Sequence, residues 1–379
     1  VFSQQLISLN TFKGGNAIND LQVTEPCSIY VSASSDDEIT LRNIIVVSEK
    51  TKISLYDLKM RRLPPTSGQL QWYPIRPSAY LTTTLDTDEL KKLNGVIYIS
   101  TLKQIENNYF YVFDVFDAQN INLQGLGNVN VTTVFLNTNT NTNPVRSTKI
   151  SNWKQGEQAR AFMYAGYPMD SIEPINTQIF SNPMHTDISN RYFSNVEQFS
   201  LGVVAFYLKT YGGCSFRIEP GYVPLAGSTT TSPTTTGFYM KPYGVLDAAI
   251  TINTLRDSTK TGYTGSNILG HLPDKGEVTF DVYDGSLHWS QSTVPNDFFA
   301  PWSTPHIGNG FVISSTYVGD GQFYVQYYTF QGPLDNFTTT VTPTPKPTTP
   351  RHVETTTKVS AAILSGFPLM ILMTCIKLL

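Results

Sequence analysis

Short runs in which apolar residues fall at every second position constrain what this 379-residue chain can fold into. In the run 278–283 (VTFDVY) this period of two places the apolar side chains on one face of a strand. Ile250 and Ile252 flank Thr251 in the same way. The run 323–328 (FYVQYY) has aromatic residues on both faces, which predicts a central strand that is covered on both sides. Because Gly, Pro and Asn clusters separate these runs, we predict an all-β fold of sandwiches or jelly rolls rather than parallel sheets.

A weak internal repeat suggests two or three tandem modules of this kind. Strand-like runs contain Tyr56, Tyr164 and Tyr283. Each is followed by a glycine that opens an apolar run, at Gly95, Gly202 and Gly310. With the composition shifts along the chain, this predicts a first β-sandwich module at 1–117, a second at 118–224, a Thr-rich linker at 225–236, a third module at 237–333, a disordered Thr/Pro stalk at 334–360 and a hydrophobic tail at 361–379.

One helix is predicted, over residues 88–93. Asp86 or Thr87 supplies the cap at its start, and Asn94-Gly95 supplies the stop.

The C-terminal run 361–379 is apolar except for Lys377, and it suits a membrane anchor. A spanning helix needs about 20 apolar residues, so a single-span tail is one interpretation. The small residues at Ser360-Ala361-Ala362 followed by a hydrophobic end match a glycosylphosphatidylinositol (GPI) signal, with Ser360 as the attachment residue. The spacer before Phe367 is shorter than the usual roughly 8–12 residues. We favour the GPI anchor, with a single span or a buried core helix as alternatives.

Several features predict export and glycosylation. The sequence begins at Val1 without an initiator Met, and we expect a secretory signal peptide to have been removed. N-glycosylation sequons occur at Asn130 and Asn336. The Thr/Pro stalk suits a stiff spacer that carries O-glycans, or plain disorder without sugar. The expected location is the extracellular face of the plasma membrane.

The chain has three cysteines, and Cys375 lies in the tail. In an oxidising compartment Cys27 and Cys214 are predicted to form a disulfide. Two buried free thiols are the alternative. Because two cysteines cannot be the framework of so long a chain, the cores are expected to be mainly hydrophobic.

Charge and motifs exclude several functions. Only 15% of the residues are charged, against about 25% in ordinary domains, and the net charge of −3 provides no basic footprint for nucleic acid. The five histidines lack metal-ligand spacing, and no nucleophile elbow or phosphate loop occurs. We therefore predict no catalytic residues and no cofactor.

Three acidic residues are candidates for Ca²⁺ ligands, namely Asp281, Asp284 and Asp320, since this ion takes six to eight oxygens. The simpler interpretation is that Asp284-Gly285 and Asp320-Gly321 are hairpin turns, for which Asp-Gly is a strong signal.

Aromatic residues in the third module are candidates for ligand stacking. Trp289, Trp302 and Phe298-Phe299 are expected in a loop between paired strands, where they could contact a sugar or a protein. Burial of these rings against the sandwich is the alternative.

The turn Asp281–Gly285 (DVYDG) and the later Gly-apolar and Phe-x-Val-x-Tyr strands resemble CUB-type domains. More narrowly, they are similar to the nematode secreted CUB-like family with GPI-type tails, best over 278–330. The chain departs from the family because CUB domains carry internal disulfides, whereas the third module has no cysteine. The resemblance implies non-enzymatic extracellular recognition of an unknown protein or glycan ligand, with a role in host defence.

Two other hypotheses stay open. A tethered hydrolase acting on glycans or esters would need two carboxylates or a nucleophile pair in a cleft. A structural surface-coat component would self-associate.

Overall fold

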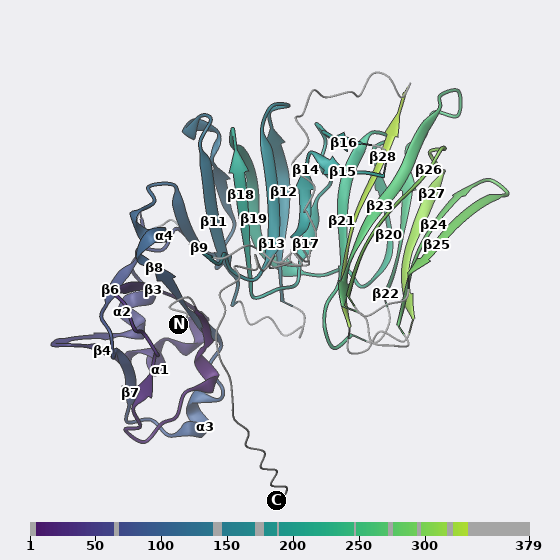
Figure 1. Ribbon diagram of the computed structural model, residues 1–379. Coiled ribbons are helices and arrows are strands. Elements are labelled where there is room, and N and C mark those ends of the chain that lie inside the picture. The colour runs from purple at the N-terminus through teal and green to yellow at the C-terminus, as the bar shows by residue number, and fades with distance from the viewer. Residues whose placement is uncertain are drawn as a thin grey trace, which may run out of the picture. The chain divides into compact units, whose positions relative to one another are not determined.

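The computed structural model describes residues 5–63, 68–138, 146–170, 178–187, 189–245, 248–271, 276–293, 297–316 and 321–332. Within these residues the chain is nearly all β, and its strands form three β-sandwiches that follow one another along the sequence (Figure 1). The predicted all-β fold of sandwich modules is confirmed.

The first sandwich contains the strands from β1 to β8. One sheet has the order β1 (Gln5–Ser8), β8 (Gly95–Thr101), β3 (Cys27–Ala33), β6 (Tyr73–Ile75), and the other has the order β2 (Asn19–Asp20), β7 (Tyr80–Thr83), β4 (Ile44–Ser48), β5 (Thr51–Ser54). Ile29, Val46 and Ile97 belong to the apolar cluster that both sheets share. The helical segments in this part of the chain are η1 (Leu9–Thr11), η2 (Ser35–Asp37), α1 (Glu38–Arg42), α2 (Leu55–Lys59), α3 (Thr87–Leu90) and α4 (Leu102–Glu106).

The second sandwich occupies the middle of the sequence. One sheet has the order β14 (Gln178–Asn182), β13 (Arg160–Ala165), β18 (Ala205–Tyr211), β11 (Asn130–Leu136), β9 (Phe110–Asp114). The facing sheet has the order β10 (Gln119–Asn122), β19 (Cys214–Tyr222), β12 (Arg146–Gln155), β17 (Phe199–Leu201). The 3₁₀ turn η3 (Gln124–Leu126) and the small pair β15 (Met184–His185) and β16 (Asn190–Arg191) also belong to this part of the sequence.

The third sandwich follows the same plan. One sheet has the order β20 (Ala226–Thr231), β22 (Ala248–Thr254), β27 (Gly310–Thr316), β24 (Glu277–Asp284), β25 (Leu287–Thr293), and the other has the order β21 (Thr235–Lys241), β28 (Gln322–Gln331), β23 (Gly262–His271), β26 (Asp297–Thr304). The pairs β9–β11 and β20–β22 are parallel, in sheets that are otherwise antiparallel.

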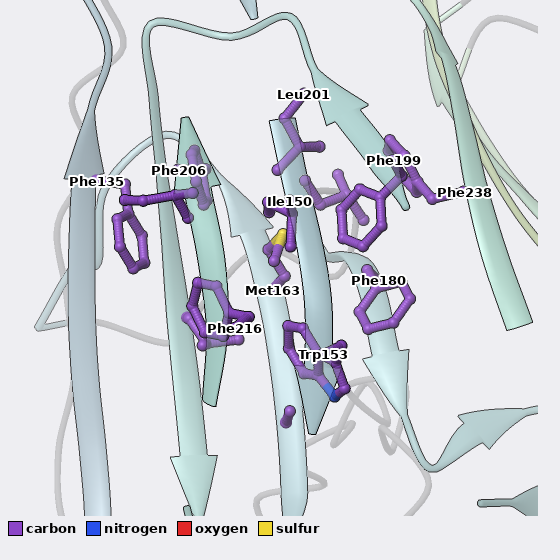
Figure 2. Close-up of a cluster of buried hydrophobic side chains, with 14 of the residues drawn as sticks. Phe135, Ile150, Trp153, Met163, Phe180, Phe199, Leu201, Phe206, Phe216 and Phe238 are labelled. Carbon is purple, nitrogen blue, oxygen red and sulfur yellow. The ribbon is translucent and has the colours of Figure 1, made fainter. Parts of the chain in front are cut away.

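Aromatic rings fill the middle sandwich. Phe135 on β11 lies opposite both Phe206 and Phe113 in the register of its sheet, and its ring centroid is 4.8 Å from that of Phe206 and 5.7 Å from that of Phe113. Phe216 of the facing sheet approaches Phe135 to 6.0 Å. Figure 2 shows Phe135, Phe206, Phe216 and Trp153 between the strands. Such ring pairs add about 0.5–1.5 kcal/mol each beyond the area that they bury.

Apolar contacts also join neighbouring sandwiches. Tyr30 and Tyr98, on the outer side of the first sandwich, share a buried cluster with Val134 and Tyr207 of the second. The cluster inside the second sandwich extends to Phe238 and to Leu269 and Tyr324 of the third. Consequently β3 and β28 are buried on both faces, as the aromatic alternation in 323–328 predicted for β28.

The period-two pattern is also confirmed in β24 and β22. Val278, Phe280 and Val282 are fully shielded from solvent, while the residues between them are half-buried. Ile250 and Ile252 are likewise buried in β22.

The predicted helix is present but shorter. Asp86 caps α3: its side chain accepts from the amide of Glu89 at 2.8 Å, and the Glu89 carboxylate accepts from the amide of Asp86 at 3.1 Å. This reciprocal capping box explains why the sequence predicted the start of α3 correctly.

Two sequence expectations need correction. The residues around Tyr56 were expected to form a strand, but β5 ends at Ser54, whose hydroxyl caps α2, so Tyr56 lies on a helix while Tyr164 and Tyr283 lie on strands. Residues 225–236 were expected to be a linker, but β20 pairs with β22 and β21 begins at Thr235. Thr is β-branched and favours strands, and the Glu197 carboxylate accepts hydrogen bonds from Thr231 and Ser232.

The remaining domain boundaries stay predictions. The stalk and the tail at 361–379 lie outside the described residues, as does every residue from 333 onward. None of the helices that the structure describes has the length and apolar character of a membrane span.

Replacing Phe135 by Ala should lower the free energy of unfolding by about 3–5 kcal/mol, because the ring is fully buried and its removal leaves a cavity. Urea unfolding followed by tryptophan fluorescence measures this difference. Tyr243→Ala, at a residue that is 65% exposed, is the matched control and should change stability by less than about 0.5 kcal/mol. A loss below about 1 kcal/mol in Phe135→Ala would show that the stack does not hold the sandwich.

Candidate functional site

An exposed sheet face of the third sandwich carries the strongest candidate for a binding site. The alternation along β24 that buries Val278 and Val282 turns Asp281 and Tyr283 outward. On the neighbouring strands, His288 of β25 and Gly310 of β27 lie opposite Tyr283 in the register. We call this surface the Tyr283 face; it comprises Thr251, Asn253, Asp281, Tyr283, His288 and Gly310.

The ring of Tyr283 lies across β27. A side-chain carbon at Gly310 would come within 2.5 Å of the tyrosine hydroxyl and 2.8 Å of the ring carbon that bears it, so the ring can keep this position only while residue 310 is glycine. Asn253 of β22 is the next residue along this line, because it pairs with Gly310. The Tyr283 hydroxyl donates to its Oδ1 at 3.5 Å.

Ionisable groups surround the ring. His288 Nε2 lies 3.4 Å from Asp281 Oδ1, and the two side chains are 60% and 24% exposed. At the end of β24, Arg256 forms an ion pair with Asp284. The face therefore offers a carboxylate, an imidazole and an amide around one aromatic ring.

The candidate calcium ligands that the structure describes have different partners. Asp281 faces His288, Asp284 faces Arg256, and Asp320 lies outside the described residues. The described part of the chain contains no cluster of three or more His, Cys, Asp or Glu residues arranged to hold a metal ion. Gly285 has a positive φ of 60°, as the hairpin interpretation of Asp284-Gly285 requires.

The tryptophans of the third module are not in a loop. Trp289 lies on β25 and Trp302 on β26, and both pack against the apolar cluster of the sandwich. The Trp302 ring meets Phe280 edge-on at 5.3 Å. Burial, the alternative interpretation, is the correct one for these two rings; of Phe298 and Phe299 the structure describes only the backbone.

Asp114 is a buried carboxylate with a perturbed pKa, the property that would mark a general acid. Burial raises its pKa from 3.8 to about 6, against hydrogen bonding from Ser32 and the charges of Arg62 and Lys59, which lower it. Ser32 Oγ donates to Oδ1 at 2.7 Å, and Arg62 Nη2 donates to Oδ2 at 2.9 Å.

This carboxylate is closed to any substrate. Its side chain is 2% exposed, and the Arg62 side chain that pairs with it is 7% exposed. Arg62 is held in turn by the Phe116 ring, whose centroid is 3.8 Å from the guanidinium carbon. Asp114 therefore joins β9 to β3 and the chain around Arg62, which is a structural role.

The predicted disulfide between Cys27 and Cys214 is wrong in this structure. Both residues are free and buried, and they belong to the clusters of two different sandwiches. Burial raises the pKa of the Cys27 thiol to about 12 and also raises the pKa of Cys214, so neither is a ready nucleophile.

The predicted modification sites are described only in part. Asn130 opens β11 and is exposed to solvent, as an N-glycan requires. Asn336 and Ser360 lie outside the described residues.

Sequence analysis missed the residues that complete the Tyr283 face. Asn253 and Gly310 are far from Tyr283 in sequence, and only the strand order brings them together. Gly310 was noted as the start of a strand, but its role in making room for the ring has no signal in a single sequence.

The comparisons with known proteins identify one family. A family model described as transmembrane glycoprotein matches residues 24–375. No curated protein matches the chain. Among solved structures, the chain resembles the CUB1-EGF-CUB2 domain of human MASP-1/3, with 8% identity and a TM-score of 0.19 over 55% of this chain and 99% of that one. It also resembles the extracellular region of zebrafish Gpr126/Adgrg6, with 7% identity and a TM-score of 0.19 over 59% of this chain and 37% of that one.

The raised pKa of Asp114 predicts a pH dependence of stability. The folded chain binds this proton more tightly than the unfolded chain, so the contribution of Asp114 is fully present below pH 4 and is lost as the pH rises to about 6. The change amounts to roughly 3 kcal/mol. Asp114→Asn cannot titrate, so its stability relative to the natural protein should rise by this amount over that window.

Urea unfolding of both proteins between pH 4 and 7 measures the difference, in which the titration of shared groups cancels. Asp117→Asn, at an exposed aspartate, is the control for removing a carboxylate. A difference that is independent of pH would show that Arg62 offsets the effect of burial.

Proposed function

The chain belongs to the transmembrane glycoprotein family, whose model spans nearly all of it, and from this membership we propose a tethered extracellular recognition protein. It acts by binding or adhesion at the outer face of the plasma membrane, without a catalytic step. The resemblance of the third module to CUB-like domains adds host defence as the setting of this recognition.

The observation that carries this proposal is the contrast between the Tyr283 face and Asp114. The perturbed carboxylate that a hydrolase would need is sealed in a joint between sheets. The aromatic ring, amide, carboxylate and imidazole of the Tyr283 face are instead open to solvent to different degrees. Solvent-facing aromatic and polar groups on the outer face of a sheet are suited to recognition.

The apolar run 361–379 supplies the tether in this proposal, by a GPI anchor at Ser360 rather than by a span. The Thr/Pro segment before it holds the sandwiches away from the bilayer. Membership of a transmembrane glycoprotein family supports attachment to a membrane.

A phosphatidylinositol-specific phospholipase should release the full chain from the surface of expressing cells. Surface labelling before treatment and immunoblotting of the medium afterwards measure the released fraction. Ser360→Trp should lower that fraction several-fold, because the attachment site requires small residues.

Complete resistance of the surface protein to the enzyme would show that a single span, and not a lipid anchor, holds the chain in the membrane. The proposed recognition function would be unaffected. A chain that stays inside the cell without reaching its surface would refute the proposed function.

Asn130 should carry an N-glycan, because it is exposed and begins the sequon Asn-Val-Thr. Asn130→Gln should increase the electrophoretic mobility of the chain by the equivalent of one glycan, and treatment of both proteins with peptide-N-glycosidase should abolish the difference between them. Unchanged mobility of Asn130→Gln would mean that this sequon is not used.

A further inference from the structure

We propose that the Tyr283 face binds neutral pyranose sugars. This inference rests on the proposed recognition function and names the class of ligand that is recognised. The sugar would stack its C–H face on the Tyr283 ring and place its hydroxyls on Asn253 and Asp281. Three features of the face support this assignment: the placement of the ring, the polar groups around it and their charge.

The ring is held as a platform. One side of Tyr283 covers Gly310, where any side chain would collide with the hydroxyl end of the ring. Tyr283 is half-buried, so part of its side chain stays in contact with solvent. The negative face of an aromatic ring attracts positively polarised C–H groups, which a pyranose presents on one side.

The polar groups match the hydroxyls of a sugar. The exposed Asn253 amide donates to the Thr229 carbonyl at 3.4 Å and keeps a second N–H and its Oδ1 for a ligand, and the Asp281 carboxylate can accept from two hydroxyls. The bond from the Tyr283 hydroxyl to Asn253 is 3.5 Å long, at the weak limit of a hydrogen bond, so a ligand hydroxyl can replace it at little cost. Thr251, two residues before Asn253 on the same side of β22, adds a further hydroxyl.

The charges select against acidic sugars. Arg256 is paired with Asp284, so this cation is already neutralised at the end of β24. Asp281 places a carboxylate on this face, with its Oδ1 3.4 Å from His288 Nε2. A sialylated glycan would bring a second carboxylate to this surface and be repelled.

Saturation-transfer NMR on the full chain tests the proposal directly. The chain is purified in a phosphocholine detergent, because detergents with sugar headgroups would compete, and is treated with peptide-N-glycosidase. The probes are lactose, maltotriose, chitotriose and 3′-sialyllactose. We expect at least one neutral probe to bind with a Kd on the order of 1 mM, as suits a shallow site with one ring.

Matched variants locate the binding. Tyr283→Ala should weaken the bound neutral probe at least tenfold, while Tyr283→Phe, which keeps the ring, should weaken it less than threefold. Tyr243→Ala removes an exposed tyrosine of the same sandwich outside the Tyr283 face and should have no effect. Asp281→Asn should raise the binding of sialyllactose relative to lactose, since it removes the repelling charge. Thermal melts confirm that each variant is folded.

Failure to bind any neutral probe, or equal binding by Tyr283→Ala and the natural protein, would overturn the site. Tighter binding of sialyllactose than of lactose by the natural protein would overturn the ligand class. A chain at the cell surface that binds no probe rejects this inference and leaves the proposed function standing. A chain that binds lactose but never reaches the surface rejects the proposed function alone.

Discussion

Stacked aromatic rings around Phe135 hold the two sheets of the middle sandwich together, and both neighbouring sandwiches depend on that body. The apolar cluster inside it continues into Phe238 and Tyr324 of the third sandwich. A second cluster joins the outer side of the sheet that contains β9, β11 and β18 to Tyr30 and Tyr98 of the first sandwich. Since Cys27 and Cys214 remain free thiols, burial of apolar surface carries the stability that a disulfide between them would have added.

One buried amide gives the joint between the second and third sandwiches its register. Gln326 on β28 accepts from the backbone amide of Ser181 at 2.9 Å and donates to the Ser181 carbonyl at 2.7 Å, as a neighbouring strand would. Its Nε2 also lies 3.1 Å from the hydroxyl of Thr236. An amide buried without these partners would destabilise the chain, so the joint tolerates no slip of β28 along β14.

The sequence predicted the features that depend on one short segment. It did not predict the features that depend on pairing or packing between segments far apart in the chain. The alternation in β24, the covered strand β28 and the cap at Asp86 follow from local pattern and were found. Thr-rich residues such as those of β20 look like a linker because their pairing partner β22 is separated from them in sequence. For the same reason no pattern shows that Gly310 makes room for Tyr283, or that Cys27 and Cys214 lie in different cores.

The alternation does, however, indicate which sheet face is left for a ligand. In β28 apolar and aromatic residues occupy both faces; one face packs into the core of the third sandwich and the other lies at the joint with the second. In β24 the outward positions include Thr279 and Asp281, whose burial without partners would be unfavourable, so no apolar joint can form there. The strand that is apolar on one face only is therefore the one whose outer face stays in contact with solvent. Tyr283 is the exception in that polar row, and an aromatic ring kept among hydroxyl, amide and carboxylate groups has a physical reason to be there if it meets the apolar side of a sugar.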